Sequence, residues 1–212
     1  MKHRQLSRRE MIEMCIIRGS LTCVAATSQA ALLAAWQRAE RDLLSPTSGE
    51  PLGPFHKKNA PDVRVLRRPG DPGLPLRVSG NVRTTRDAIL PNATLEVWQT
   101  DFKGHYDIEG YKYRAKIRPS DDGAYWIETV MPGRYDDRPV QHIHYVVSAP
   151  GHKTLVTQAY FATDPFFEGN PDANYAKDGH VQHRALVRPV TLSEREGRAY
   201  AAITFDVVLE QV

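Results

Sequence analysis

The sequence predicts an all-β fold, an antiparallel β-sandwich core with long wrapping loops. From residue 76 onward, short runs rich in β-branched and aromatic residues recur along the chain, as the strands of a sandwich do. The run LEVW at 95–98 alternates apolar and polar residues, which is typical of a strand with one buried face. Asp-Gly and Pro-Gly pairs at 122–123, 132–133 and 150–151 lie between the runs and mark tight turns.

The expected strands are the runs at 76–82, 94–100, 124–130, 142–148, 154–161, 185–190 and 202–209. Helical patterns are confined to a short N-terminal helix or signal segment and to residues 192–198. Helices therefore contribute little to the predicted core.

Three segments are expected: a signal at 1–36, an extended Pro- and Gly-rich arm at 37–75, and the catalytic sandwich at 76–212. Arg8 and Arg9, in the run SRREMI, follow a basic start and precede a small-residue, mildly apolar stretch, which resembles a twin-arginine export signal. We therefore expect an exported or periplasmic protein. The stretch is too polar for a spanning helix, so no integral membrane span is expected in the mature chain. An ordinary amphipathic helix on a cytoplasmic protein is the alternative.

Charge and cysteine content exclude two other classes of function. The formal net charge is +3, and residues 1–36 carry five basic and two acidic residues. The remainder holds 23 of the 28 basic and 23 of the 25 acidic residues, so it is neutral, which argues against nucleic-acid binding. Cys15 and Cys23 both lie in the signal segment, so the body has neither a disulfide framework nor a cysteine-ligated zinc site.

The run RPVQHIHYVV at 138–147 places two histidines one residue apart in an expected strand. Side chains two apart in a strand project from the same face, so His142 and His144 point the same way. Two imidazoles make half of a site for Zn, Cu, Fe or Ni. A cupin-type site would need a Glu shortly after His144, but the next acid is Asp164, so that hypothesis fails.

Two tyrosines stand at turns near this strand. Tyr135 follows the Pro132-Gly133 turn, seven residues before His142, and Tyr106 follows the strand at 94–100 and a turn at Lys103-Gly104. The ordered motifs are a Trp-containing strand ending in Gly-x-Tyr, then Pro-Gly-x-Tyr, then Arg-Pro before His-Ile-His, then Thr-Gln. Over about residues 53–210 they resemble, in order and spacing, the intradiol ring-cleavage dioxygenases of the protocatechuate and catechol type, in particular a small exported branch.

The resemblance implies a non-haem Fe(III) cofactor with four protein ligands. Tyr106 and His142 would be equatorial ligands, and Tyr135 and His144 axial ligands. A bound trivalent ion would drive deprotonation of the phenols, whose unperturbed pKa is near 10. The alternative is structural: the tyrosines would be packing residues, and the histidines would be hydrogen-bonded sheet residues.

The resemblance also implies roles for residues beside the iron. Tyr135 would take a proton from the substrate, Arg138 would stabilise charge on the ring, and Gln158 would line the same pocket. Gln158 has an alternative as a core amide. Three residues separate Arg138 from His142, one more than in the best-known members, and we expect a bulge to absorb the extra residue.

The implied reaction uses a catecholic substrate and O₂. Oxygen would insert between the two hydroxylated carbons and give a muconate-type diacid, and the chain would form a homo-oligomer as the family commonly does. A secreted, non-catalytic β-sandwich binding module that has lost iron is the alternative function. Candidates for binding a substrate carboxylate are Lys57, Lys58, Arg114 and Arg118. The tyrosines expected to be packing residues are Tyr111, Tyr113, Tyr125, Tyr145 and Tyr160.

Overall fold

The computed structural model describes residue 31 and residues 43–212 except 178 and 196. The predicted signal segment therefore lies, apart from residue 31, outside the described residues. Residues 44–212 form one compact unit, which is described here by itself. The boundaries predicted at residues 36 and 75 stay predictions.

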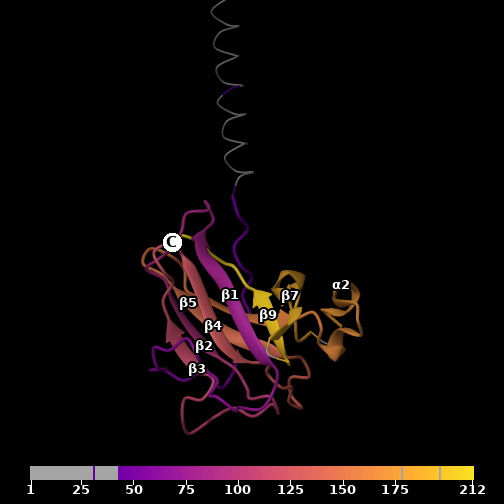
Figure 1. Cartoon of the computed structure of the whole chain (residues 1–212). Coiled ribbons are helices and arrows are strands. Elements are labelled where there is room, and N and C mark those ends of the chain that lie inside the picture. The colour runs from indigo at the N-terminus through magenta and orange to yellow at the C-terminus, as the bar shows by residue number, and fades with distance from the viewer. Residues whose placement is uncertain (1–30, 32–42, 178, 196) are drawn as a thin grey trace, which may run out of the picture. The chain divides into compact units, whose positions relative to one another are not determined.

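Two β-sheets, each of five strands, make up the described body, which confirms the all-β sandwich (Figure 1). The first sheet contains β1 (Pro75–Thr84), β4 (Ala124–Val130), β8 (Thr191–Arg195), β9 (Arg198–Thr204) and β10 (Val207–Leu209). The second has the order β3 (Arg114–Ile117), β2 (Thr94–Trp98), β5 (His142–Ser148), β6 (Leu155–Phe161) and β7 (Val187–Arg188).

Both sheets are mixed rather than purely antiparallel. β1 is the central strand of the first sheet: it pairs antiparallel with β4 and parallel with both β9 and β10. In the second sheet β2–β3, β2–β5 and β5–β6 are antiparallel, and only the short β6–β7 pair is parallel. Antiparallel pairing thus builds the part of the second sheet that carries the histidines.

Alternation along the strands produces the core. Every second residue of β1 is buried, beginning with Leu76 and Val78, as expected for a strand with one face against a core. Leu95 and Val97 of β2 do the same in the second sheet. Tyr125, the second residue of β4, is 1% exposed and donates a hydrogen bond to the Phe205 carbonyl at 2.5 Å, so its predicted packing role is confirmed.

The predicted helix at 192–198 is wrong. This segment is the end of a β-hairpin, in which β8 and β9 pair antiparallel with Leu192 opposite Ala201. Leu, Glu and Arg favour a helix locally, but pairing with β9 overrides that weak preference. Gly197 has φ +71 between the strands, a conformation that glycine adopts without strain.

Short helices fill the connection between β6 and β7. They are η1 (Pro165–Phe167), α2 (Pro171–Asn174) and η2 (Arg184–Leu186). In the part of the chain that the structure describes, no helix has the length and apolar character needed to span a membrane.

Candidate metal centre

Strand β5 presents the two histidines on the face of the second sheet that points away from the core. His142 and His144 are each 2% exposed, whereas Ile143 between them belongs to the hydrophobic core. The predicted shared face follows from the two-residue period of a strand. The histidines are therefore buried on their own side of the sheet, beneath the N-terminal arm.

The strand register adds further side chains to this face. Trp98 of β2 and Gln158 of β6 lie directly opposite His144, and Tyr160 of β6 lies opposite His142. Paired residues in an antiparallel sheet project from the same side, so these side chains form two adjacent rows. Arg114 of β3 is paired with Trp98 and extends the first row.

Two glycines bring the tyrosines together. A Cβ atom on Gly104 would lie 2.0 Å from the Arg134 carbonyl oxygen, and one on Gly133 would lie 2.2 Å from the Gly104 nitrogen. The two turns thus pack backbone against backbone, which only residues without a Cβ allow. Tyr106 and Tyr135 each stand two residues after one of these glycines, so both phenols arrive beside β5.

Three donor atoms converge in the site. Tyr106 Oη lies 3.1 Å from His144 Nε2 and 3.4 Å from His142 Nε2, and the two Nε2 atoms are 3.1 Å apart. The Tyr135 ring lies 5.8 Å from the Tyr106 ring and 6.0 Å from the His142 ring. Phe55 of the arm stacks on Tyr106 at 4.2 Å and limits its movement.

Burial keeps these groups uncharged in the absence of a cation. It lowers the pKa of His142 to about 4 and holds the pKa of His144 well below its usual range. It also raises the pKa of both the Tyr106 and Tyr135 phenols above the ordinary value. Neutral imidazoles are the form that binds metals, and a strongly bound cation would be needed to ionise the phenols.

The donor set fits a ferric ion. Among the described residues, no group of three or more His, Cys, Asp or Glu side chains is placed to hold a metal, and the candidate site instead combines two imidazoles with two phenols. His142 Nδ1 is 2.7 Å from the Val140 carbonyl oxygen, a contact that turns Nε2 toward the site and is typical of metal-binding histidines. Two phenol oxygens with two imidazole nitrogens suit a hard, trivalent cation that stabilises phenolates.

The side chains of Arg138 and Gln158 contact each other beside the candidate metal ligands. Arg138 Nη2 donates hydrogen bonds to Gln158 Oε1 at 2.7 Å and to the Tyr160 hydroxyl at 3.1 Å. The three residues between Arg138 and His142 precede β5 and lie outside any strand, and a turn before them joins the backbones of Tyr135 and Arg138 by hydrogen bonds. A loop rather than a bulge within the strand therefore places Arg138.

The buried Asp164 carboxylate holds the segment just before β5. It accepts a hydrogen bond from the Gln141 backbone amide at 2.5 Å and one from the Phe166 amide at 2.9 Å. Because Gln141 is adjacent to His142, this contact fixes where the histidine strand begins.

The sequence gives no direct signal for several residues of the site. Tyr160, expected only to pack, is buried, and its hydroxyl donates to Gln158 Oε1 at 3.0 Å. Tyr160 stands two residues after Gln158 on a strand, and this spacing indicates that both side chains project from the same face. From the sequence, Trp98 is expected only as the tryptophan of the first motif, and Phe55 is not singled out. Tyr111 is 37% exposed and is not a core residue.

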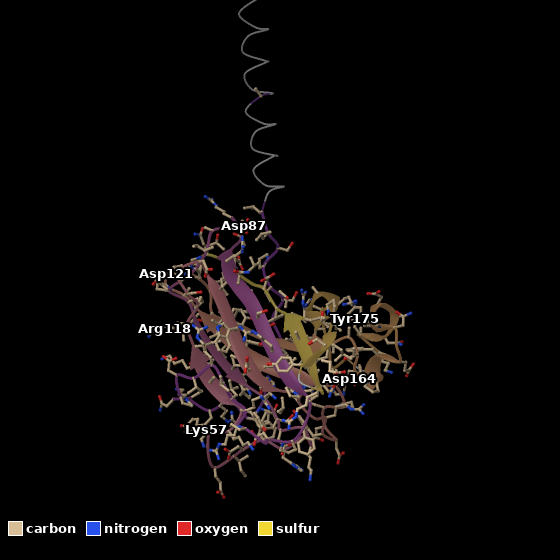
Figure 2. The ribbon with its side chains drawn as sticks, viewed as in Figure 1. Lys57, Asp87, Arg118, Asp121, Asp164 and Tyr175 are labelled. Atoms are coloured by element: carbon tan, nitrogen blue, oxygen red, sulfur yellow. The ribbon has the colours of Figure 1, made fainter. Side chains whose placement is uncertain are left out.

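Two of the side chains predicted to bind a substrate carboxylate already donate hydrogen bonds to backbone carbonyls of the protein. Lys57 donates to three carbonyl oxygens, those of Ile108, Glu109 and Gly110, at 2.6–3.3 Å. Arg114 is 3% exposed and donates to the carbonyls of Phe55 and Asp107. In Figure 2, Lys57 and Asp87 lie at opposite ends of the sandwich. Arg118 lies along its side, between those ends.

Known proteins are similar to this chain in sequence and in fold. A family model described as "Dioxygenase" matches residues 52–211. A chlorocatechol 1,2-dioxygenase of Rhodococcus opacus is 26% identical over 77% of this chain and 72% of its own length. A catechol 1,2-dioxygenase of Pseudomonas sp. (strain EST1001) is 31% identical over 57% of this chain and 49% of its own length. The chain spans about half the length of several curated relatives.

Among solved structures, the dioxygenase domain of a dioxygenase–carbohydrate-binding protein fusion from Streptomyces sp. SirexAA-E superimposes with a TM-score of 0.65. It is 31% identical and covers 79% of this chain and 100% of that domain. The family match extends over most of the chain and includes all four candidate ligands and the Arg138–Gln158 pair. The chain belongs to the intradiol ring-cleavage dioxygenases, a family of oxidoreductases.

Proposed function

We propose that the protein is a non-haem Fe(III) dioxygenase that cleaves a catecholic ring between its two hydroxylated carbons. Both atoms of O₂ would enter the product, a muconate-type diacid. The observation that carries the proposal is the convergence of Tyr106 Oη with the Nε2 atoms of His142 and His144 within 3.1–3.4 Å of one another. Names of relatives that act on catechol, chlorocatechol and hydroxyquinol support the substrate class.

Tyr106, Tyr135, His142 and His144 would hold the iron. When bound, the ion would act as a Lewis acid and as a template for the two catechol oxygens. Tyr135 and Tyr106 are both more exposed than the histidines, and Tyr135 would receive a proton from an arriving catechol because Phe55 meets its ring only edge-on. Tyr106, held beneath Phe55, would stay in place.

Arg138 would stabilise negative charge that develops on the ring oxygen. Its guanidinium is oriented before substrate arrives, because Gln158, Tyr160 and the His180 carbonyl all accept from Nη2 at 2.7–3.4 Å. A preorganised cation in a site sheltered from water stabilises charge more than a solvated one does. Gln158 is fixed in turn, since its Nε2 donates to the Pro51 carbonyl at 2.8 Å.

The first test is the iron content and visible spectrum of the purified protein, before and after anaerobic addition of catechol. Tyrosinate bound to Fe(III) absorbs visible light by charge transfer, and chelation by a catecholate shifts that absorption. We expect close to one iron per chain, a red colour, the shift, and O₂ consumption with muconate formation on aeration.

Tyr106→Phe provides the specific variant and Tyr111→Phe the matched control. Phenylalanine keeps the ring that stacks on Phe55 but removes the phenol oxygen. Tyr111 is an exposed tyrosine whose hydroxyl only bonds the Lys58 carbonyl. The Tyr106 variant should lose most of its colour and at least about a hundredfold in rate, as loss of a metal ligand implies, and the control should keep both.

A protein that stays colourless after loading with ferrous iron in air would contradict the proposal. The alternative, a non-catalytic binding module on the same sandwich, would then become the leading interpretation.

A further inference from the structure

The two histidines of the site are held in different ways. His142 Nδ1 lies 2.7 Å from the Val140 carbonyl oxygen, whereas His144 Nδ1 is buried and has no hydrogen-bond partner among the described residues. Metal-binding histidines usually anchor the second ring nitrogen through a hydrogen bond. His144 therefore needs another source of orientation.

Trp98 supplies a flat surface against the His144 ring. The two ring planes are 4° from parallel, and their centroids lie 4.7 Å apart. Trp98 is 2% exposed and is fixed by its place in β2, directly opposite His144 in the strand pairing. Its indole Nε1 also has no hydrogen-bond partner in the described part of the chain, so ring contact is its main interaction with the site.

The arm completes the surroundings of this pair. A Cβ atom added to Gly53 would contact His144 Cε1 at 3.4 Å, so the arm backbone lies beside the edge of the imidazole. His56 lies 4.8 Å from the Trp98 ring, and its Nε2 is 2.8 Å from Glu96 Oε2. The imidazole is thus enclosed by β2 and the arm without a hydrogen bond to either.

We propose that Trp98 is a positioning residue, which orients the imidazole of His144 by ring stacking in place of the usual hydrogen bond to Nδ1. The role in metal binding rests on the proposed function. The orientation itself is a property of the metal-free protein. An offset, parallel aromatic pair stabilises its geometry beyond the contribution of its buried area, to a degree comparable with a hydrogen bond.

Trp98→Leu removes the stack and Trp98→Phe keeps an aromatic surface. Trp126→Leu is the matched control, because Trp126 is half-buried beneath Arg77 on β4, a strand of the other sheet. In the metal-free protein, the His144 ring protons should resonate upfield under the Trp98 ring current. Trp98→Leu should abolish that shift, Trp98→Phe should keep part of it, and Trp126→Leu should leave it intact.

The iron-loaded protein provides the second readout. In competition with a chelator, Trp98→Leu should weaken iron binding about tenfold, as loss of a residue that orients a ligand does. Trp98→Phe should stay within about threefold, since an aromatic pair remains. Iron should also quench Trp98 emission, so the quenched component should disappear in Trp98→Phe and persist in Trp126→Phe.

The outcomes separate this inference from the proposed function. If the parent protein binds no iron but the His144 resonances depend on Trp98 as expected, the proposed function fails and the stacking role stands. If Trp98→Leu leaves both the resonances and the iron affinity unchanged, or if Trp126→Leu reduces them equally, the positioning role is overturned. Thermal unfolding of each metal-free variant excludes loss of folding as the cause.

Discussion

At the scale of single residues, Arg114 connects three segments around the candidate iron ligand Tyr106. Its Nη1 donates to the Phe55 carbonyl at 2.6 Å and its Nη2 to the Asp107 carbonyl at 3.3 Å. Its guanidinium also lies over the Tyr106 ring, 5.9 Å from the centroid. Phe55 stacks on the same Tyr106 ring. Arg114 therefore connects the arm and the turn that carries Tyr106 to β3.

Arg114→Met should therefore lower the free energy of unfolding by about 1–3 kcal/mol, because two carbonyl groups lose their donor. Urea unfolding of the metal-free protein measures the change. Arg118→Met is the control, since Arg118 is exposed and directly follows the last residue of β3, and surface changes stay within about 0.5 kcal/mol. Equal effects of the two variants would contradict the tying role.

Glu50 is a buried carboxyl group whose ionisation should oppose folding. It is 7% exposed, and its Oε1 accepts from the Gln182 amide at 2.9 Å. Burial raises its pKa above the ordinary value of 4.5. An acid with a raised folded-state pKa contributes stability that is complete below the unfolded-state pKa and is lost as the pH rises through the folded-state value.

Glu50→Gln should remove this loss, because glutamine keeps the acceptor for the Gln182 amide and cannot ionise. The stability of the variant relative to the parent should be constant below pH 4.5 and should increase as the pH is raised above it. Unfolding by urea at a series of pH values measures the difference. A difference that is flat or that falls with rising pH would refute the expectation.

At the scale of elements, the two glycine turns decide whether the tyrosines meet. Gly133→Ala would place a Cβ atom 2.2 Å from the Gly104 nitrogen, so the turns must separate. We expect loss of iron-dependent colour and a decrease of about 1–3 kcal/mol in the free energy of unfolding, the usual cost of overpacking. Gly49→Ala is the control, because its Cβ would meet only the Val156 carbonyl at 3.5 Å. Retained colour in Gly133→Ala would show that the tyrosines do not depend on this contact.

The elements that the sequence predicts well are those with a local signal. The strand period places His142 and His144 on one face, and Gly-x-Tyr repeated before Tyr106 and Tyr135 marks two equivalent turns. Strand β8 at 191–195 is not predicted, because its strand character comes from pairing with β9 and not from its own residues, whereas the end of β9 falls within the expected strand at 202–209. Pairing across the sheet also brings Trp98 against His144, a contact between residues 46 positions apart that no local pattern can indicate.

At the scale of the whole described body, the two faces of the second sheet have different roles. The inner face of the second sheet, with Leu95, Val97 and Ile143, belongs to the core. Its outer face carries the site, and there the Gln158 side chain donates to the Pro51 carbonyl of the arm, while Thr157, on the inner face, donates to the Ser48 carbonyl. The arm therefore docks only on a folded sheet, so we expect the metal site to form after the sandwich and not before it.

We propose that residues 1–36 direct export by the twin-arginine route. This route carries folded proteins, which suits a metal site that forms only after the sandwich has folded. Because the proposed iron ligands come from β5 and two distant turns, the chain would have to fold before it could retain iron. Changing Arg8 and Arg9 together to Lys should keep the protein in the cytoplasm, folded and coloured, whereas the Arg18→Lys control should be exported normally. Cell fractionation with iron analysis of each fraction measures this. Export of the double variant at the parental level would show that the arginine pair is not a signal, and the amphipathic-helix alternative would then account for the segment.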